Sequence, residues 1–484
     1  MLKLRLFWGI LCVIAVGHAS GQGLSKEDLL EDLHFLSEAA ALAHPASLVD
    51  GGLEGLKAWT ESVIFQLPDS ISALQYRQYI DEALCHLACA HTRIVQDPLR
   101  TMPATLSYMP FALLPVDSAF YVFAARDSSH LGRTVHAINA RPMKEIHQDL
   151  LCYRASDGGG TALGSAFFNS YNAVLISAYL GFPGSYDVDF MPDNSSETGS
   201  SEVLSEQLIP IEEALLAPPR VNLFHDTLLR GERAFLCGSD GGIALLSIRS
   251  FARKDKKFFK RCIDLLLEAS YQGLIIDLRG NGGGNRYSAI QLTRHLMDEN
   301  FSYHMMVPAT SAKPYLDEEG QKTYRWARIR YSGLAIWRRS RDAELGHRVF
   351  THRYRPSRKH FSGELLLLTD GFTSSSASML STWLRASNRA RVLGSRAGGG
   401  YSGHNGGSYP TLSLPASGIR MVWPLYRFVI DPSSDQHRGL LPDVVIEPEL
   451  EDVMQGADPV MQRALEILDR PGEATQNPKA QGMP

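Results

Sequence analysis

A dense cluster of hydroxyl side chains lies between Thr373 and Ser378, in the order Thr-Ser-Ser-Ser-Ala-Ser. The apolar run Leu365–Leu368 precedes it, and apolar residues at helical spacing follow it from Met379 to Leu384. This order predicts a buried strand, a turn and the start of a helix, where open α/β sheets hold their reactive groups. A hydroxyl there stands beside N–H groups that the helix leaves unpaired. The cluster is a candidate nucleophile; the alternative is that the serines only cap the helix.

A glycine-rich loop, Arg279-Gly-Asn-Gly-Gly-Gly-Asn285, follows a second apolar run at Leu274–Leu278. The loop lacks the G-x-G-x-x-G spacing of a dinucleotide site and the Gly-Lys-Ser/Thr of a P-loop, so it argues against nucleotide binding. Consecutive glycines leave backbone N–H groups open to a site. A hydroxyl cluster and such a loop, each at a strand end, predict a nucleophile with its oxyanion hole. A tight turn without function is the alternative.

These two loops need a scaffold, and the surrounding sequence predicts one. Further buried strands are expected at Ile243–Ile248 and Arg391–Leu393, with an amphipathic helix from Phe258 to Ser270. Strands that alternate with helices in this way form a parallel sheet in an α/β fold. Helices also dominate residues 25–90, where Ser25 and Asp28 match a capping box, and a last helix is expected at Pro459–Leu468.

The chain has 484 residues and a formal net charge of −4, which argues against a nucleic-acid partner. Residues 1–21 have the order of a secretory signal peptide: Lys3 and Arg5, an apolar run, then small residues with cleavage between Ala19 and Gln22. No later stretch is long and apolar enough for a transmembrane helix. We therefore expect an exported protein, periplasmic or extracellular, without a membrane span after cleavage.

The cysteines predict neither a disulfide scaffold nor a metal centre. Loss of Cys12 with the leader leaves five in a long chain, so we expect one disulfide or none. Cys85 and Cys89 lie one helical turn apart beside His86 and His91, which raises zinc as an alternative. A single C-x3-C with two nearby histidines is weak support for zinc. We expect no metal and no other cofactor.

Four separated signals resemble peptidase family S41, the C-terminal processing (tail-specific) and tricorn-core-like serine proteases. Leu274–Asn285 is similar to the family's IIDLRxNxGG, Thr373–Ser378 to its T-x-S-A-x-E, and Gly439–Asp443 to its G-V-x-P-D. The amino-terminal helices that end in His91-Thr92 match the tricorn-like branch. The resemblance covers most of the mature chain. It implies an α/β fold with a ClpP/crotonase-like βαβ peptidase core, an N-terminal helical segment and an inserted PDZ-like, β-rich domain.

The expected domains follow the chain. They are residues 22–92 with the helices and His91, 93–155 as the PDZ-like domain, 156–235 as a linker or accessory region, 236–450 as the peptidase core, and 451–484 as a final helix and disordered tail. A glycine turn, a strand ending at Ile138-Asn139 and a short helix suggest the PDZ-like domain, which would bind extended peptides at a sheet edge. A generic β-rich module is the alternative.

The resemblance also implies residue roles in the nucleophile half of the site. Alignment of Val392-Leu393-Gly394 with the family's closing I-V-G-E places the nucleophile at Ser375. Ser376 then occupies the family's alanine position and is the fallback nucleophile. Its backbone N–H is expected to hold the oxyanion together with an N–H of Gly282 or Gly283.

The base has to come from elsewhere in the chain. The processing branch uses a lysine at a position that falls here in Gly398–Gly400. The tricorn-like branch uses a G-H-T histidine, which His91 matches, and His404 is the runner-up. That branch also has an acidic residue where this chain has Gln436, so the adjacent Asp435 is the candidate orienting acid.

The resemblance thus implies an exported serine endopeptidase acting on polypeptides, unfolded chains or C-terminal tails among them. A protein of a different class is the rival reading. Retinoid-binding repeats that resemble this family show that the same fold can serve without proteolysis, so the alternative is a catalytically impaired protein that binds peptides or apolar ligands.

Overall fold

The computed structural model describes residues 24–49, 53–98, 108–191, 200–204, 226–229, 234–238, 242–307, 311–337, 340–341, 348–434 and 437–469. The expected leader at residues 1–21, Asp435, Gln436 and the tail after residue 469 lie outside the described residues. In the part of the chain that is described, no helix is long and apolar enough to cross a membrane.

The chain divides into two compact units, each built from several segments. Unit 1 comprises Met1–Ala217, Ser302–Arg353 and Gly398–Leu440. Unit 2 comprises Pro218–Phe301, Tyr354–Ala397 and Leu441–Pro484. The serine cluster and the glycine loop belong to unit 2, whereas His91 and His404 belong to unit 1.

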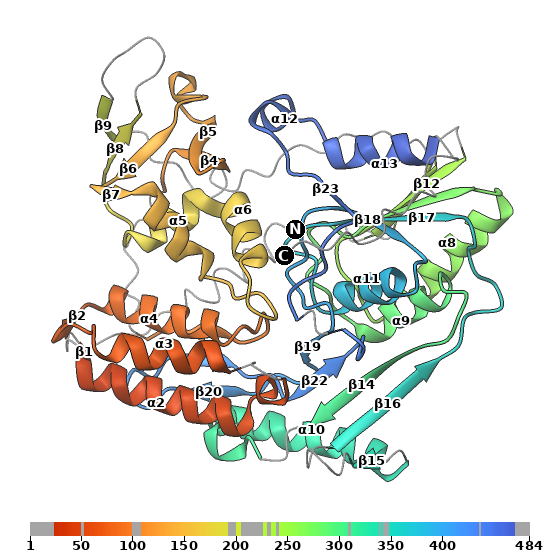
Figure 1. Cartoon of the computed structure of the whole chain (residues 1–484), viewed down its shortest axis with the longest axis horizontal. Coiled ribbons are helices and arrows are strands. Elements are labelled where there is room, and N and C mark those ends of the chain that lie inside the picture. Colours follow the sequence, from red (N-terminus) through yellow and green to blue (C-terminus); the bar gives the residue numbers. More distant parts are fainter. Residues whose placement is uncertain are drawn as a thin grey trace, which may run out of the picture. The chain divides into compact units, whose positions relative to one another are not determined.

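Unit 2 is a seven-stranded sheet with helices on its faces (Figure 1). The strand order is β10 (Asp226–Leu229), β11 (Ala234–Gly238), β12 (Ile243–Ile248), β13 (Gly273–Asp277), β17 (Glu364–Thr369), β18 (Arg391–Gly394) and β23 (Val444–Val445). Pairing is parallel from β12 to β23, which confirms the predicted α/β fold. Asp277 pairs with Leu368, so the loops that follow β13 and β17 leave the sheet at adjacent strand ends.

Both faces of this sheet are covered, which explains why its strands are continuous apolar runs rather than alternating ones. The helices α8 (Lys256–Glu268), α9 (Arg286–Arg294) and α11 (Ser376–Ala386) lie on one side of the sheet, and α13 (Pro459–Asp469) lies on the other (Figure 1). Alternate strand residues, among them Ile275, Leu366 and Leu368, pack against apolar residues of α13. The last helix predicted from the sequence therefore closes the core. A short helix, α12 (Leu450–Gln455), precedes it.

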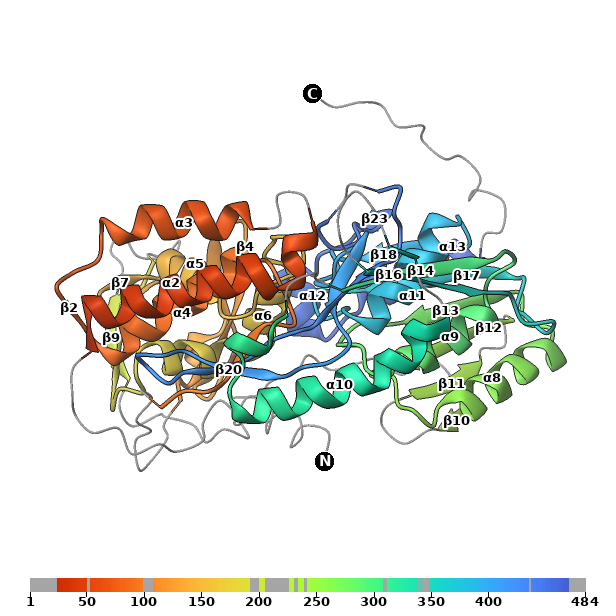
Figure 2. The same ribbon diagram turned by 90° about the horizontal axis from the view of Figure 1, so that it is seen from below.

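Unit 1 begins with three helices that lie side by side in both views: α2 (Lys26–Ala43), α3 (Glu54–Ile64) and α4 (Ala73–His86) (Figures 1 and 2). The predicted capping box is confirmed, because the Ser25 side chain accepts from the Asp28 N–H while the Asp28 carboxylate accepts from the Ser25 N–H. The strand β3 (Arg93–Gln96) follows α4 and joins β20 (Thr411–Ser413) and β21 (Arg420–Val422) in a small sheet.

Unit 1 also contains a five-stranded sheet, the helix α10 and a two-stranded pair. A five-stranded sheet contains β14 (Phe301–Val307), β15 (Ser340–Arg341), β16 (Arg348–Tyr354), β19 (Gly403–Gly406) and β22 (Tyr426–Val429). The helix α10 (Glu318–Trp337) packs on β20, and its Gly320 allows close approach, since a Cβ there would lie 2.0 Å from the Thr411 carbonyl oxygen. A two-stranded pair, β1 (Leu24–Ser25) with β2 (Ser70–Ile71), ties the first helix to the start of α4.

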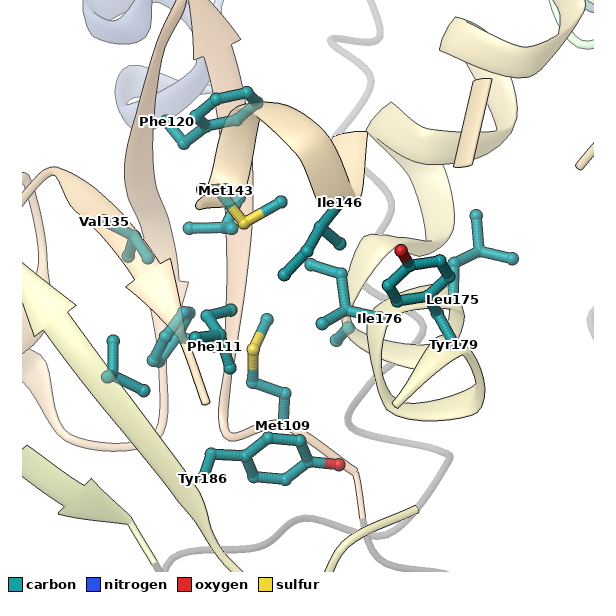
Figure 3. Packing of buried hydrophobic residues seen from close by; sticks show 14 of the residues in the cluster. Met109, Phe111, Phe120, Val135, Met143, Ile146, Leu175, Ile176, Tyr179 and Tyr186 are labelled. Atoms are coloured by element: carbon teal, nitrogen blue, oxygen red, sulfur yellow. The ribbon is translucent and has the colours of Figure 1, made fainter. Parts of the chain in front are cut away.

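A β-rich module forms the rest of unit 1, with its own core (Figure 3). Its elements are β4 (Phe111–Val116), β5 (Ala119–Ala125), β6 (Val135–Ile138), β7 (Arg141–Pro142), α5 (Met143–Leu151), α6 (Ala162–Tyr179), β8 (Tyr186–Phe190) and β9 (Ser200–Leu204). The core joins Phe111 and Ile146 to Ile176 of α6 and Tyr186 of β8. Packing therefore runs across residue 155, where the sequence had suggested that the PDZ-like domain ends and a linker begins.

Candidate active site

Ser375 occupies the turn between β17 and α11, one residue before the helix starts. Its backbone angles are φ 55° and ψ −122°, a combination that residues other than glycine rarely adopt. Ser375 is half-buried, whereas Ser374, Ser376 and Ser378 are buried. Its side chain forms no capping hydrogen bond, so the alternative in which the serines only cap the helix does not hold for Ser375.

The neighbouring hydroxyls are engaged in the fold. Ser376 Oγ donates to the Gly284 carbonyl oxygen at 3.1 Å, and Ser378 Oγ donates to that of Thr373 at 3.2 Å. Thr373 Oγ1 donates to the Leu278 carbonyl oxygen at 3.1 Å. These bonds fasten the serine cluster to the glycine loop. Ser374 is buried, so Ser375 carries the most exposed hydroxyl among the four serines.

The glycine loop lies directly against Ser375. Gly283 has φ 95°, and a Cβ on it would lie 2.7 Å from Ser375 Cβ and 2.9 Å from Ser376 N. Only glycine fits there, because a real Cβ does not approach other heavy atoms so closely. The Gly283 N–H donates to Asn281 Oδ1 at 2.8 Å. Of the two glycines expected to donate to an oxyanion, Gly283 is therefore occupied in this structure.

Two backbone N–H groups beside Ser375 remain open. Neither the Gly282 N–H nor the Ser376 N–H has an acceptor among the described residues. The Gly282 N–H belongs to the loop after β13, and the Ser376 N–H is the first of α11, which has no intrahelical acceptor. A helix start and a glycine loop thus present the N–H groups that an oxyanion hole requires.

The half-buried carboxyl of Asp370 joins these two loops. Its oxygens accept from the Gly280 N–H at 2.8 Å and from the Phe372 N–H at 3.0 Å. Burial raises the pKa of Asp370 to about 6, against which these N–H donors act only in part. Asn281 adds a second link, because its carbonyl oxygen accepts from the Ser374 N–H at 3.1 Å and its Nδ2 donates to Ile248 O at 2.9 Å.

An ion-pair network anchors the base of the glycine loop. Arg279 Nη1 lies 2.7 Å from Asp458 Oδ1, and its Nε lies 3.0 Å from Asp277 Oδ1. Asp458 comes from the segment just before α13, so the tail of the domain fixes the direction in which the loop leaves β13. Asp443 performs a similar task at β18, where its carboxylate accepts from the Val392 N–H at 2.9 Å.

In unit 1, His91 lies in the turn between α4 and β3 with a buried carboxylate behind it. Its Nδ1 is 3.9 Å from Asp157 Oδ1, and the two side chains are 13% and 2% exposed. Asp157 accepts from the Ala90 N–H at 2.9 Å and from the Gly400 N–H at 3.4 Å. Burial opposes its ionisation, yet the imidazoles of His91 and His404 and the Ala90 N–H keep the pKa of Asp157 below its usual value. An ionised carboxylate therefore faces Nδ1 of His91.

Aromatic rings fix the plane of the His91 imidazole. The ring stacks on His404 with centroids 5.4 Å apart and on Tyr409 with centroids 5.8 Å apart. His404, the runner-up base, is buried on β19, and its ring also packs against Phe428. His91 is the more exposed of the two histidines. Its Nδ1 also lies within ion-pair distance of the Asp157 carboxylate, at 3.9 Å.

His44 supports the segment that follows His91. His44 is fully buried, and burial lowers its pKa to about 3, so it is neutral. Its Nδ1 accepts from the Ala46 N–H at 3.0 Å, which leaves Nε2 to donate to Thr92 Oγ1 at 2.8 Å. The Thr92 of the sequence motif is thus a structural anchor for its neighbour.

Sequence reasoning missed Asp157, which lies in residues 156–235, the expected linker or accessory region. The signal was the run Ser156-Asp-Gly-Gly-Gly160, an acidic residue followed by three glycines. Gly158 has φ 72°, and a Cβ there would lie 2.1 Å from the His437 carbonyl oxygen. Two segments of the chain therefore cross closely at this run, which holds the Asp157 carboxylate in place and is not a flexible connection. Asp435, the expected orienting acid, lies outside the described residues.

Among the described residues, one group could hold a metal ion: Cys89, His91 and Asp157, whose donor atoms lie within 4.8 Å of one another. Burial raises the pKa of the Cys89 thiol, and a protonated thiol is a poor metal ligand. The zinc alternative drawn from the sequence also needed Cys85 and His86, which are not part of this group. His86 instead stacks on Trp59.

Comparison with known proteins identifies the core. Residues 242–446 match the model of peptidase family S41, a range that contains the glycine loop, Ser375 and Gly439–Asp443. The chain carries a family S41 peptidase domain. This confirms the resemblance seen in the sequence and makes the protein a serine-type peptidase. Among curated proteins, no match to this chain was found.

Solved structures share the fold of this chain over most of its length. Mature CPAF complexed with lactacystin is 15% identical, with 92% of this chain and 98% of that chain covered and a TM-score of 0.58. A serine-to-alanine mutant of CPAF is 14% identical, with 92% and 96% covered and a TM-score of 0.61. At these identities the likeness shows a common fold, and it extends to the segments outside residues 242–446.

Proposed function

We propose that this S41 peptidase is an exported serine endopeptidase with Ser375 as nucleophile, His91 as base and Asp157 as the acid that orients His91. The observation that carries the proposal is the backbone of Ser375, held at φ 55° against Gly283 beside two open N–H groups. Such strain concentrates at reactive positions and projects a side chain from a sharp turn between strand and helix.

In the reaction, Ser375 Oγ attacks the carbonyl carbon of a peptide bond while His91 takes the hydroxyl proton. The carbonyl oxygen becomes an oxyanion, which the N–H groups of Gly282 and Ser376 stabilise. His91 then gives its proton to the departing amine, and an ester to Ser375 remains. Water, deprotonated by the same histidine, hydrolyses that ester and regenerates the serine.

The role of Asp157 follows from which nitrogen it faces. Because Nδ1 of His91 is the atom near the carboxylate, Nε2 is the atom available to the serine. An ionised Asp157 favours the tautomer that carries its proton on Nδ1 and stabilises the imidazolium that forms during the reaction. The 3.9 Å separation is longer than a hydrogen bond, and we expect it to shorten when substrate is bound.

The leader at residues 1–21 supports export, and the β-rich module supports extended polypeptides as substrates. Its four-stranded sheet has the order β7-β6-β8-β9, so β7 and β9 are the outer strands of the described sheet. An extended segment of an unfolded chain or a C-terminal tail could pair with such an edge. The module would then act as the PDZ-like domain expected from the sequence.

A fluorophosphonate probe tests the nucleophile directly. The wild-type protein should form one covalent adduct, which peptide mass spectrometry places on Ser375, and Ser375→Ala should not label. Ser376→Ala is the matched control: its hydroxyl is replaced but its N–H stays, so it should still label at Ser375. An adduct on Ser376, or equal labelling of Ser375→Ala, would overturn the assignment. Absence of any adduct on folded wild-type protein would favour the binding-protein alternative.

A further inference from the structure

Three side chains of different chemistry converge at the proposed base. Cys89, His91 and Asp157 each offer one donor atom, and the thiol sulfur, His91 Nδ1 and a carboxylate oxygen all lie within 4.8 Å of one another. All three residues belong to unit 1, and Cys89 and Asp157 are buried. Thiolate sulfur, imidazole nitrogen and carboxylate oxygen are the atoms that bind Zn²⁺ in proteins. The mixed donor set therefore suits zinc better than Ca²⁺ or Mg²⁺, which take oxygen ligands.

The spacing of these atoms fits a bridging metal ion better than it fits direct contact. His91 Nδ1 is 3.9 Å from Asp157 Oδ1, which is too far for a hydrogen bond. Two ligand atoms on one tetrahedral zinc ion, each about 2.0–2.3 Å from it, lie about 3.3–3.6 Å apart. Shifts of roughly 1 Å would bring all three donors to the spacing of a zinc site.

The nitrogen that faces this group lacks a partner, although its surroundings hold it in place. His91 Nδ1 is buried and forms no hydrogen bond with any of the described residues. A buried polar atom without a partner is uncommon in a folded protein. Aromatic rings that stack on the imidazole fix its plane, and Asp157 is held by the Ala90 and Gly400 N–H groups. Contacts of this kind orient the ligands of metal sites.

We propose that Cys89, His91 and Asp157 bind one Zn²⁺ ion and that this ion inhibits the peptidase. The site stands on the donor geometry, whereas the inhibition rests on the function proposed above. A neutral imidazole that coordinates zinc through Nδ1 carries its proton on Nε2. Nε2 of His91 can then only donate a hydrogen bond, so it cannot take the proton of the Ser375 hydroxyl.

Zinc binding releases one proton to the solvent. Burial raises the pKa of the Cys89 thiol, so the metal-free protein holds this thiol protonated, and its proton leaves as the bond from zinc to sulfur forms. The His91 proton moves from Nδ1 to Nε2, and the Asp157 carboxylate is already ionised, so neither changes the count. Loss of the thiol proton weakens binding, and three protein ligands leave the fourth position of the ion for water. We therefore expect reversible binding that a chelator undoes.

Cobalt(II) spectroscopy tests the site without reference to activity. Co²⁺ occupies zinc sites, and its bond to a thiolate gives a charge-transfer band in the near ultraviolet. The full-length protein, freed of metal with EDTA, should develop this band with one equivalent of Co²⁺, and Zn²⁺ should abolish it. Cys85→Ser, four residues earlier in the chain, is the matched control and should keep the band, as should Ser375→Ala, whereas Cys89→Ser should lose it. A band that Cys89→Ser retains would overturn the site, and so would wild-type protein without the band, an outcome that requires no variant to fold.

Fluorophosphonate labelling tests the inhibition. When zinc fills the site, wild type and Cys85→Ser should label at least about tenfold more slowly than the same protein in EDTA, because general-base catalysis is lost. Cys89→Ser should bind Zn²⁺ at least about 100-fold more weakly in calorimetry, and at the same zinc concentration it should keep its own EDTA rate.

The possible failures of this experiment are distinguishable. Undiminished labelling of wild-type protein, at a zinc concentration that abolishes the cobalt band, would overturn the inhibition and leave the site in place. Wild-type protein that does not label even in EDTA would contradict the proposed function and the inhibition with it, while the cobalt band still decides the metal site.

Discussion

Replacement of Gly283 by alanine tests whether the glycine loop positions the nucleophile. The new Cβ would lie 2.7 Å from Ser375 Cβ and 2.9 Å from the Ser374 carbonyl oxygen, at a φ of 95° that suits only glycine. Backbone strain costs about 1–3 kcal/mol, and overpacking of a tight site costs about 1–3 kcal/mol more. We therefore expect Gly283→Ala to lower the free energy of unfolding by about 2–6 kcal/mol.

The effect on the reaction should exceed the effect on stability. Relief of the clash moves Ser375 or Ser376, and a displacement of about 1 Å at a reacting atom can reduce the rate by roughly 10²-fold. Urea unfolding followed by fluorescence measures the first quantity. The rate of fluorophosphonate labelling, together with kcat on an unfolded protein substrate at a temperature where the variant is folded, measures the second.

Gly282 offers a matched control in the same loop. A Cβ there would meet nothing nearer than Ser374 Oγ at 4.0 Å, and the backbone N–H proposed to hold the oxyanion is retained. Gly282→Ala should therefore unfold at close to the wild-type urea concentration and label at least about tenfold faster than Gly283→Ala. If Gly283→Ala labels as fast as Gly282→Ala, contact between the loop and Ser375 does not set the geometry of the nucleophile, and the reasoning fails.

Two further predictions concern carboxyl groups. Asp157→Asn should keep its fold but lose roughly 10²–10⁴-fold in kcat, because the neutral amide neither selects the His91 tautomer nor stabilises the imidazolium. Steady-state kinetics measure this loss. A near-normal kcat would show that Asp157 does not belong to the site. Asp370 has a pKa raised by burial to about 6 against an ordinary 3.8, so the folded protein binds a proton more tightly than the unfolded chain. Its contribution to stability is present below pH 4 and is lost as the pH rises through 6, by about 3 kcal/mol in total. In urea unfolding, the stability of the wild type relative to Asp370→Asn should fall by most of that amount between pH 4 and 7, and a constant difference would contradict the shifted pKa.

That the serine cluster and the glycine loop lie together could be predicted because their signals are local in the sequence. Apolar runs of strand length fixed β13 and β17, and helical spacing fixed α11, so the loops that carry Gly282 and Ser375 had to leave the sheet at neighbouring strand ends. Which N–H groups stay open could not be predicted. That depends on the Asn281 side chain, which accepts from Gly283 and leaves Gly282 without an acceptor.

The base half was predicted less completely because it is assembled from distant segments. His91 could be named from its motif, but its carboxylate comes from residue 157, across the β-rich module, and no periodicity connects the two. A glycine run after an acidic residue resembles a linker in sequence. Gly158 and Gly400 are glycines, however, because segments of the chain cross closely there, and a Cβ on Gly400 would lie 2.2 Å from the Gly403 carbonyl oxygen. The contribution of α6 to the core of the β-rich module could not be predicted for the same reason, since α6 joins that core through long-range packing.

The strained backbone of Ser375 explains why so much of the surrounding structure is rigid. A conformation that costs about 1–3 kcal/mol persists only where its neighbours hold it in place. Here the Met379 N–H donates to the Ser375 carbonyl oxygen at 3.0 Å, and the Ser374 N–H donates to Asn281 at 3.1 Å. The backbone is thus held from both sides, and the hydroxyl does not have to be fixed by a hydrogen bond of its own. It follows that the main chain sets the direction of the Ser375 side chain, which would leave both lone pairs and the proton of the proposed nucleophile free for the substrate and the base.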